Sequence, residues 1–552
     1  MMTRATDLEA TEGVFNQAPP LQDHNRYLGH AAMRDALARE CGPAVAAAME
    51  PALARLGEEL ASADWITRGE LANRHPPELR LYDAQGRRLD RFDFHPAWHD
   101  CLDWLKRNHV AGAAWADEQP GAQTKRAALF QLFAEVECGS LCPATMTHAA
   151  LPLLMREPAL AEPWLRLALA PAHDPRFIPA AGKRGLLIGM GLTERQGGSD
   201  VRANISRADP AGDGWYRITG HKWFFSVAMS DAFLVTAQGA DGLGCYFMPR
   251  FLPDGSLNAL HLVRAKDKLG DRSNASAEVR FDGALALPLG EQGRGIATII
   301  EMASYTRLDC ANGSAGIMRA ALAHALHHAR HRQAFGKPLI AQPLMAQVLA
   351  DMAVEVEGHV ALCLRVAATL DRQRDDAAEA ALKRLLTPVA KYWVCKRSPA
   401  LVAEAMEVLG GNGYVEESPM PRLFRQSPLN AIWEGASNIM CLDVLRALAR
   451  DKNAGAALAA ELAPARGRHP AYDRHLDRLG KLLAAPQEAD ARRLTEAIAL
   501  AVSAARLLQG DGIAGEAFCL GRLQEGAGSN AFGGGPALDT AALLQRARPD
   551  PP

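Results

Sequence analysis

The stretches WYRIT at residues 215–219 and WFFSV at residues 223–227 mark the region of the chain that decides the fold. Both are short runs rich in β-branched and aromatic residues, the composition typical of β-strands. Comparable runs, separated by Gly, Asp and Pro turn signals, follow at residues 233–237, 245–248, 261–264 and 278–281. Short strands at this spacing predict an antiparallel β-sandwich or barrel, and the lack of helical patterns between them disfavours a Rossmann domain.

Helical patterns flank this β-region. Ala/Leu-rich sequence with charges at helical spacing covers most of the first third of the chain. After Gly295, long amphipathic segments match a bundle of about four antiparallel helices. These segments are residues 296–332, 344–371, 377–396 and 399–409. A last Ala/Leu-rich segment begins near Arg446 and ends in a Gly-rich loop at 526–535 and a short helix.

The sequence therefore predicts an α+β, multi-domain protein. Its predicted parts are an N-terminal extension and helical domain (1–184), an antiparallel β-barrel or sandwich (185–290), a C-terminal four-helix bundle (291–445) and an additional helical domain (446–552).

Two smaller predictions concern the first hundred residues. We expect the first dozen residues to be disordered, and the Pro-stiffened stretch 14–21 to lie extended over another surface. A turn signal at Ala84-Gln85-Gly86 predicts a small hairpin within residues 81–94.

Composition indicates an ordinary globular protein. Hydrophobic residues make up 48% and charged residues 22% of the 552, so neither disorder nor a membrane class is indicated. The formal net charge of -2 predicts no general attraction to nucleic acid or anionic lipid. The 10 cysteines include no CxxC pair, which favours reduced thiols. Since no signal-peptide pattern or membrane-length apolar run occurs, we predict a cytoplasmic protein without membrane contact.

Two stretches have the composition of a ligand site. Residues 190–200 (MGLTERQGGSD) would turn at two glycines and present backbone N–H groups and hydroxyls to an anionic ligand, unless they only link two domains. Aromatic residues at 223–225 beside Ser226 suit a planar ring, with core packing as the alternative. Gly189-Met190-Gly191 lacks the third glycine of a dinucleotide fingerprint, so we reject that interpretation.

Glu434 stands in the sequence Ile432-Trp433-Glu434-Gly435-Ala436-Ser437-Asn438. The glycine permits a sharp turn close to a ligand, and the preceding large ring makes the surroundings partly apolar. Such surroundings raise the pKa of a carboxylate towards values that suit a general base. By itself the pattern is also that of an ordinary loop acid.

Five separated motifs resemble those of acyl-CoA dehydrogenases and occur in the same order. They are Thr193-Glu194 through Gly198-Ser199-Asp200, the Trp223 strand, RQAFGKPL at 332–339, GGNGY at 410–414 and Trp433-Glu434-Gly435. Residues 14–17, 73–90, 138–143, 183–191 and 221–226 resemble the alkylation-response branch of that family, the AidB-type proteins. The resemblance covers nearly the whole chain to about Arg446 and continues more weakly beyond.

The resemblance implies a non-covalent FAD and a homotetramer in which two subunits build each flavin site. The 190–199 loop, the aromatic strand and the Glu434 segment would surround the flavin ring, while residues near 332 and 410 would meet the adenosine diphosphate of the neighbouring subunit's flavin. The implied cofactor-binding residues are Met190, Leu192, Thr193, Gly198, Ser199, Phe224, Phe225, Ser226, Arg332, Phe335, Gly410, Gly411, Gly413, Ile432, Trp433, Gly435, Ser437 and Asn438.

The resemblance also implies the chemistry. Glu434 would remove the α-proton of an acyl-CoA thioester while a hydride leaves the β-carbon for the flavin. Some relatives carry the base one position before an Arg that matches Arg307, but Thr306 occupies that place here. Trp433 is bulkier than the usual residue and would narrow the acyl pocket, so we expect a short or branched substrate and weak turnover. Other departures from the family pattern are Arg195, Pro343, Glu407 and Ala436.

AidB-type proteins are associated with weak acyl-CoA oxidation and with DNA binding through their final segment. Arg446, Arg492 and Arg493 are our candidates for contact with double-stranded DNA. Acids are nearly as numerous in this segment and no DNA-binding motif is recognisable, so a modest patch would depend on the avidity of a tetramer. Two alternatives stay open: a non-enzymatic flavoprotein that shields DNA, and a flavin oxidase of another small substrate.

Four histidines on one predicted helix, His324, His327, His328 and His331, include pairs at the i, i+4 spacing of metal ligands. No carboxylate or thiolate accompanies them, and arginines are interleaved. We therefore predict no metal and assign these side chains to diphosphate contact or helix surface.

Overall fold

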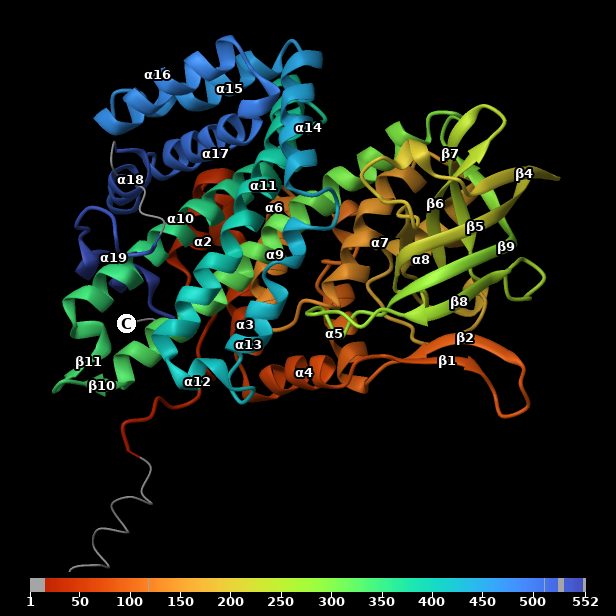
Figure 1. The fold of residues 1–552 in the computed structure, drawn as a ribbon, viewed down its shortest axis with the longest axis horizontal. Coiled ribbons are helices and arrows are strands. Elements are labelled where there is room, and N and C mark those ends of the chain that lie inside the picture. The colour runs from red at the N-terminus through yellow and green to blue at the C-terminus, as the bar shows by residue number, and fades with distance from the viewer. Residues whose placement is uncertain (1–14, 118, 511, 525–530, 550–552) are drawn as a thin grey trace, which may run out of the picture.

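The computed structural model describes residues 15–117, 119–510, 512–524 and 531–549. The predicted disorder of the first dozen residues and half of the Gly-rich loop at 526–535, residues 526–530, therefore lie outside the described residues. Figure 1 shows a helical body beside a β-sheet, with the C-terminal helices stacked on the helical body. The predicted α+β architecture, with helices before and after a middle sheet, is confirmed.

The chain before the sheet is mainly helical. In α5, Pro96 starts the helix, the His95 side chain accepts a hydrogen bond from the N–H of Ala97, and Trp98, Leu102 and Leu105 recur on the buried face. The helices of this part are α2 (Ala31–Cys41), α3 (Pro43–Glu59), α4 (Ala63–Arg74), α5 (Pro96–Arg107), α6 (Ala122–Ala134), α7 (Leu141–Leu154) and α8 (Arg166–Leu169).

The predicted hairpin is confirmed. Strands β1 (Glu78–Tyr82) and β2 (Arg88–Asp93) pair antiparallel. The hairpin docks on strand β8 of the main sheet, because Arg88 Nη2 donates to the carbonyl of Leu262 at 2.6 Å and the Asp90 carboxylate accepts from the N–H of Leu262 at 3.0 Å.

The middle sheet has seven strands, and their pairings form a closed circuit through β6, β4, β5, β9 and β7. All pairings in it are antiparallel except those of β6 with β3 and with β4, which are parallel. The interior is apolar and centred on the rings of Phe225, Phe233 and Phe281. The strands are β3 (Ile188–Gly191), β4 (Arg207–Gly212), β5 (Trp215–Ser226), β6 (Ala232–Gly239), β7 (Gly242–Pro249), β8 (Leu260–Ala265) and β9 (Ser276–Leu289).

The prediction of two separate strands at 215–219 and 223–227 is wrong, because β5 runs unbroken through both. Gly220 lies inside the strand, just after its register with β9 has shifted. A Cβ at Gly220 would lie 2.3 Å from Ser206 Oγ, so this glycine permits a close approach of two strands rather than a turn.

Three long helices, α9 (Gly295–His331), α10 (Pro343–Arg372) and α11 (Ala377–Leu409), form the body after the sheet. The predicted break before Pro399 is wrong, since α11 contains both Pro388 and Pro399. Each proline removes one helical hydrogen bond, but α11 packs closely against α9, and that burial outweighs the loss. The short helices α12 (Gly411–Tyr414) and α13 (Met420–Gln426) lead to α14 (Ser437–Arg450).

The C-terminal helices are tied to this body by buried ion pairs. Arg365 on α10 bonds Glu379 on α11 at 2.9 Å and Glu461 on α15 at 2.8 Å. Arg506 on α17 donates to Glu40 on α2 at 2.9 Å. The last helices are α15 (Ala454–Leu462), α16 (Pro470–Ala484), α17 (Ala491–Leu507), α18 (Ile513–Phe518) and α19 (Thr540–Ala547). None of the described helices is long and apolar enough to span a lipid bilayer.

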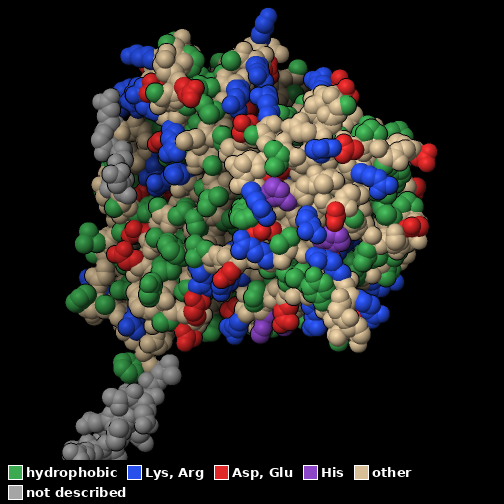
Figure 2. Space-filling view, turned by 45° about the vertical axis from the view of Figure 1, so that its right-hand side comes forward, with side chains coloured by type: hydrophobic (Ala, Val, Ile, Leu, Met, Phe, Trp, Pro, Cys, Tyr) green, Lys and Arg blue, Asp and Glu red, His purple; other side chains and the backbone are tan. Residues whose placement is uncertain are grey.

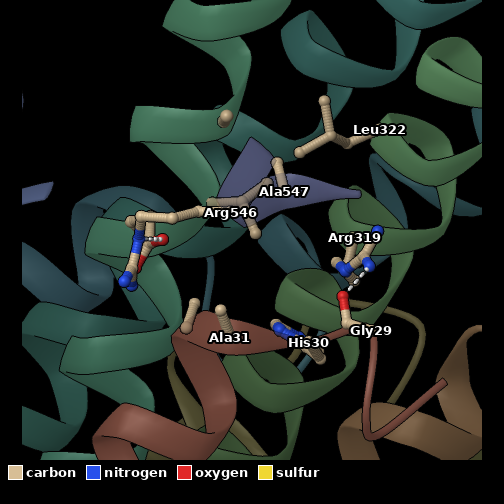
Figure 3. Close-up of a pocket in the computed structure, with 11 residues that line it drawn as sticks. Gly29, His30, Ala31, Arg319, Leu322, Arg546 and Ala547 are labelled. Atoms are coloured by element: carbon tan, nitrogen blue, oxygen red, sulfur yellow. Dashed lines mark hydrogen bonds and ion pairs between the residues drawn. The ribbon is translucent and has the colours of Figure 1, made fainter. Parts of the chain in front are cut away.

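Helix α19 returns to the N-terminal helices. A Cβ at Gly29 would lie 1.9 Å from the carbonyl oxygen of Pro549, so this contact requires a glycine. Figure 3 shows the small cavity beside it, where Arg319 Nη2 donates to the Gly29 carbonyl at 2.7 Å and Arg546 bonds Glu357 at 3.0 Å. Since these charged groups bond to the protein around them, the cavity is a packing gap rather than a ligand site.

Candidate active site

The Glu434 segment forms a left-handed turn between a short 3-10 helix, Leu429–Ala431, and α14. Glu434 has φ +57° and Gly435 has φ +98°. A non-glycine residue in this region costs about 1 kcal/mol or more, so other contacts must hold the turn. A Cβ at Gly435 would lie 2.5 Å from Met440 Cε, which gives a second reason for a glycine there.

The Glu434 carboxyl is held by Thr306 on α9. Thr306 Oγ1 lies 2.6 Å from Glu434 Oε2 and 3.1 Å from the carbonyl of Ala303. The hydroxyl has one proton, so it can donate to a Glu434 carboxylate, or donate to Ala303 and accept from a protonated Glu434. Burial raises the pKa of Glu434, and the Thr306 hydrogen bond and the charges of Arg307 and Lys391 oppose that rise. A carboxyl so placed can take up and release a proton.

Two buried cations bind the backbone of the same turn. Lys391 Nζ on α11 donates to the Trp433 carbonyl at 2.8 Å and also to the Gly435 carbonyl. Arg307 Nε on α9 donates to the carbonyl of Glu434 at 3.0 Å. All three carbonyls from 433 to 435 are therefore bound by side chains of the helical body.

The residues on either side of Glu434 are also fixed. Trp433 Nε1 donates to Asn430 Oδ1 at 2.9 Å, and Asn430 Nδ2 donates to Ser314 Oγ on α9 at 3.1 Å. Asn438, in the first turn of α14, accepts from Arg492 Nε on α17 at 2.9 Å. Ile432 and Asn438 are exposed, and Ser437 is partly exposed.

The predicted β-loop is a tight turn, but its charged residue is structural. The Thr193 carbonyl accepts from the N–H of Trp223 at 2.8 Å, and a Cβ at Gly198 would lie 2.3 Å from Thr193 Oγ1. Lys222 Nζ lies 2.9 Å from Glu194, and both side chains are fully buried. Burial raises the pKa of Glu194, but the Lys222 charge and hydrogen bonds from residues 205 and 206 outweigh it and lower the pKa to about 2.

The aromatic strand needs one correction. Phe224 is 50% exposed, as expected of a residue that faces a ligand, whereas Phe225 is fully buried against Phe233, 4.7 Å between ring centroids. The register of β5 shifts between Lys222 and Phe225, so Trp223 and Phe224 both face outward and the residues on either side of them both face inward. The expectation that the Phe225 side chain stands against a flavin ring is therefore wrong, because this bulge turns it into the β-core.

Cations surround the Trp223 ring. Lys266 Nζ lies 3.7 Å from the ring centroid, and the guanidinium carbons of Arg264 and Arg195 lie 5.4 Å and 5.7 Å away. Sequence patterns did not predict this grouping, because Arg264 lies on β8 and Lys266 just after it, far from Trp223 along the chain. Ser226 is partly exposed, and Met190 and Leu192 pack against the large core.

The remaining predicted cofactor residues lie at the other end of the helical body. Arg332 follows the end of α9, Phe335 is 98% exposed, and Gly410, Gly411 and Gly413 lie where α11 passes into α12. In Figure 1 this end, marked by α12 and the short strands β10 (Gln333–Ala334) and β11 (Lys337–Pro338), is on the side away from the seven-stranded sheet. One chain therefore does not bring these residues to Glu434.

The N-terminal stretch crosses this same end, as the prediction that it lies over another surface requires. Arg332 Nη1 donates to the carbonyl of Asn16 at 2.6 Å, and the N–H of Gln333 donates to Asn16 Oδ1 at 2.7 Å. The ring of His327 lies 2.8 Å from the carbonyl of Pro19. Burial and nearby Arg26 lower the pKa of His324 to about 3, so this histidine is neutral at ordinary pH.

A flavin dinucleotide fits the groups that the loop and strand present. Gly198 and Ser199 are exposed, and within the described ranges neither their N–H groups nor the Ser199 hydroxyl bonds another protein atom. A Cβ at Gly197 or Gly411 would meet nothing within 4 Å, so a ligand could approach the backbone closely. Exposed Phe224 offers an apolar face, and the N–H of its neighbour Trp223 donates to the Thr193 carbonyl of the same loop.

The candidate DNA residues lie on α14 and α17. Arg446, Arg492 and Arg493 are exposed, but Arg492 bonds Asn438 and Arg493 lies 3.5 Å from Asp490. Figure 2 shows Lys and Arg side chains gathered over the upper part of the face in view, where the C-terminal helices lie in Figure 1.

Sequence reasoning missed the residues that hold Glu434. Lys391, Asp443 and Asn430 were not considered, and Thr306 was considered only as an absent base. One signal was present: Lys391 stands in the apolar run PVAKYWV at 388–394, and a lysine on the buried face of a helix needs a partner.

Comparison with known proteins matches almost the whole chain. Residues 16–175 match the family model of the adaptive response protein AidB N-terminal domain, 189–284 the acyl-CoA dehydrogenase middle domain and 293–449 the acyl-CoA dehydrogenase C-terminal domain. The chain is 50% identical over 501 residues to "Putative acyl-CoA dehydrogenase AidB" of Escherichia coli (strain K12), which covers 90% of this chain and 92% of that protein.

More distant relatives agree with that match. Acyl-CoA dehydrogenase family member 11 of Caenorhabditis elegans is 29% identical over 80% of this chain and 74% of its own. The crystal structure of C. elegans ACDH-11 in complex with C11-CoA superposes with a TM-score of 0.84 at 26% identity, over 99% of this chain and 95% of that one. An acyl-CoA dehydrogenase complexed with FAD from Bacillus anthracis, 17% identical over 82% of this chain and 83% of that one, shares the fold with a TM-score of 0.63.

Proposed function

The chain belongs to the acyl-CoA dehydrogenase family, in its AidB-type branch, and from this premise we propose that it is a FAD-dependent acyl-CoA dehydrogenase with Glu434 as the base. The observation that carries the proposal is the Glu434 carboxyl itself. It is partly shielded from water, and the Thr306 hydroxyl can donate to its ionised form or accept from its protonated form. The turn that carries it is held by side-chain hydrogen bonds to three successive carbonyls.

Glu434 takes the proton from the carbon next to the thioester carbonyl. Its raised pKa makes it a stronger base than an exposed glutamate, and Thr306 can follow the change of charge by turning its hydroxyl towards Ala303. The bound FAD supplies the acceptor for the hydride that leaves the β-carbon. The acyl chain thus loses one proton and one hydride, and its α–β bond becomes double.

We assign the cofactor to two surfaces. The Thr193–Ser199 loop offers N–H groups and hydroxyls to the flavin edge and diphosphate, and Phe224 and Ser226 offer a face for the ring. Arg332 and the glycines at 410, 411 and 413 are assigned to the diphosphate end of a neighbouring subunit's FAD. The substrate is a short or branched acyl-CoA, because the Trp433 ring is held in place by Asn430 and cannot easily swing aside.

We propose a homotetramer, as the family resemblance implies, and the second surface supports contact with a neighbouring copy. Large apolar side chains project from that end of the body, and a second copy is the occupant that would cover them and receive Arg332. They are Phe15 (70% exposed), Phe335 (98%), Leu344 (85%) and Tyr414 (80%). Single exposed apolar residues are common, but four on adjoining segments favour an interface.

The test is to reconstitute the purified protein with FAD and titrate it anaerobically with acyl-CoAs of increasing length and branching. We expect the flavin absorbance to bleach with a short or branched member of the panel. Glu434→Gln should keep the bound FAD and lose the bleaching by about a thousandfold in rate, the usual contribution of a general base. Bleaching by the wild type that survives in Glu434→Gln would contradict the assignment of the base.

The same preparation tests the alternatives. Peroxide release with a small acidic C–H substrate, without bleaching by any acyl-CoA, would favour a flavin oxidase. Salt-sensitive duplex binding that survives Glu434→Gln and fails when Arg446, Arg492 and Arg493 are replaced by Gln would favour a role on DNA. The exposure of these three arginines and the cations on that face support this second candidate.

A further inference from the structure

Lys391 occupies an unusual place in α11. Its side chain is only 1% exposed, yet the Nζ atom binds the carbonyls of Trp433 and Gly435, the residues on either side of Glu434. For one ammonium to reach both, the residue between them must fold the chain back. The positive φ of Glu434 provides that fold, so the Lys391 contacts and the left-handed turn depend on each other.

The charge of Lys391 has no carboxylate of its own. In the described part of the chain, no Asp or Glu forms an ion pair with Lys391, whereas Arg307 is paired with Asp443 at 2.9 Å. Asp443 is in turn shared with Arg384 at 2.7 Å. A buried cation without a counter-ion acts most strongly on the nearest group that can become negative.

Lys391 acts on the carboxyl of Glu434 and on the thiols of Cys310 and Cys395. Burial raises the pKa of both thiols, so Glu434 is the group of the three that can be negative at ordinary pH. The other side chains that bear on Glu434 are Thr306 and Arg307 from α9, and Cys310, whose pKa is raised by burial and by the negative charge of Glu434, and lowered by Lys391. Arg307 shares Asp443 with Arg384, so Arg307 and Lys391 both favour the ionised form of the Glu434 carboxyl. Of these two cations, Lys391 is the one that pairs with no carboxylate among the described residues.

We propose that Lys391 is a positioning residue for the Glu434 base, holding the left-handed turn that presents the carboxylate and supplying the positive charge that lets it ionise. The proposal rests on the proposed function of Glu434. Lys391 touches no reacting atom in this scheme. Lys391 contributes hydrogen bonds that hold the two carbonyls and a positive charge that acts on the carboxyl. Substitutions can separate these two contributions.

Two variants divide these contributions. Lys391→Gln removes the charge but keeps a donor for a carbonyl, and Lys391→Met removes both. In anaerobic flavin reduction by the most effective acyl-CoA, both variants should move the acid limb of the pH–rate profile up by roughly one unit, because the carboxylate has lost a neighbouring cation. Lys391→Met should also lower the plateau rate by roughly a hundredfold through a displaced base. Lys396→Met, an exposed lysine on the same helix, is the matched control and should change neither.

An unshifted acid limb in both Lys391 variants, with normal FAD content, would overturn the proposal. A loss of rate without any shift would reduce Lys391 to a packing role and would also overturn it. If one variant fails to fold, the other is measured instead, because Gln keeps a hydrogen-bond donor and Met keeps only the apolar packing of the side chain.

A second readout does not depend on turnover. The infrared carboxyl band that disappears in Glu434→Gln reports the titration of this one side chain, in protein without substrate. Its midpoint should be higher in Lys391→Gln than in the wild type, and an equal midpoint would overturn the proposal. If no acyl-CoA bleaches the wild-type flavin, the proposed function fails, while this titration still decides whether Lys391 controls Glu434.

Discussion

The Glu434 turn and the Arg332 end of the same helical body differ in where their partners come from. At the turn, three carbonyls and the carboxyl are bound by α9 and α11 of the same chain. At the other end, the Arg332 side chain donates to the carbonyl of Asn16 in the N-terminal stretch, and Phe335 stands almost fully in solvent. The difference indicates that the half of the proposed site around Glu434 is complete when one chain has folded, and it supports our proposal that a second chain completes the other half.

The largest expected effect concerns the Glu434 turn, whose partners all belong to the same chain. Asp443→Asn would leave the buried side chain of Arg307 without its counter-ion and weaken the hold on Glu434. Breaking a buried ion pair costs about 3–5 kcal/mol, so we expect a loss of about that size in the free energy of unfolding, measured by urea denaturation. Asp490→Asn, which breaks the exposed pair with Arg493, should cost less than about 1 kcal/mol. Equal losses would contradict the contrast between buried and exposed pairs.

The β-loop at residues 193–199 is also held by contacts within one chain. Its buried Glu194–Lys222 pair should make the free energy of unfolding depend on pH. The pKa of Glu194 falls from 4.5 to about 2 in the folded protein, so its contribution to stability is present above pH 4.5 and is lost as the pH falls towards 2. We expect the free energy of unfolding to drop by about 3 kcal/mol over this interval from Glu194 alone. Glu194→Gln should remove that part of the slope. An unchanged slope in the variant would show that the Lys222 pair contributes little.

The Arg332 end of the helical body is tested by Phe335→Asp. If a second copy covers this ring, a buried carboxylate should weaken the assembly by about 2 kcal/mol or more, which analytical ultracentrifugation would detect as dissociation into smaller species. FAD content should fall with dissociation, while the monomer keeps its helical circular dichroism. Ile513→Asp, at a partly exposed apolar position on α18, is the control and should leave the assembly intact. An unchanged oligomer in Phe335→Asp would place the interface elsewhere.

The smallest expected effect compares two glycines, one from each half. Gly435→Ala must adopt a positive φ and move Met440, so we expect a loss of about 1–2 kcal/mol in unfolding free energy. Gly411→Ala meets no atom within 4 Å and should change stability by less than about 0.5 kcal/mol. Thermal unfolding of the two variants measures the difference, and similar melting temperatures would argue against a strained turn.

Sequence patterns predicted the layout and failed where contacts are long-range. Runs rich in β-branched and aromatic residues located β5 to β9 but not β3 and β4. The bulge at Trp223 and Phe224, where the register with β9 shifts, reversed the side of Phe225. Helical periodicity located α11 but stopped it at Pro399, because burial against α9 is not visible from one segment. Glu434 could be chosen from its motif, whereas Lys391 and Asp443 could not. Lys391 contacts the Glu434 turn, and Asp443 contacts Arg307, only after the chain has folded. The division into four domains stays a prediction.

The seat of Pro549 on Gly29 has a consequence for synthesis in the cell. Helix α2 is translated long before the segment around Pro549 that packs against Gly29. The surface beside Gly29 must therefore stay uncovered until that segment has been made. A polypeptide that lacks the segment would leave this surface exposed to chaperones and proteases.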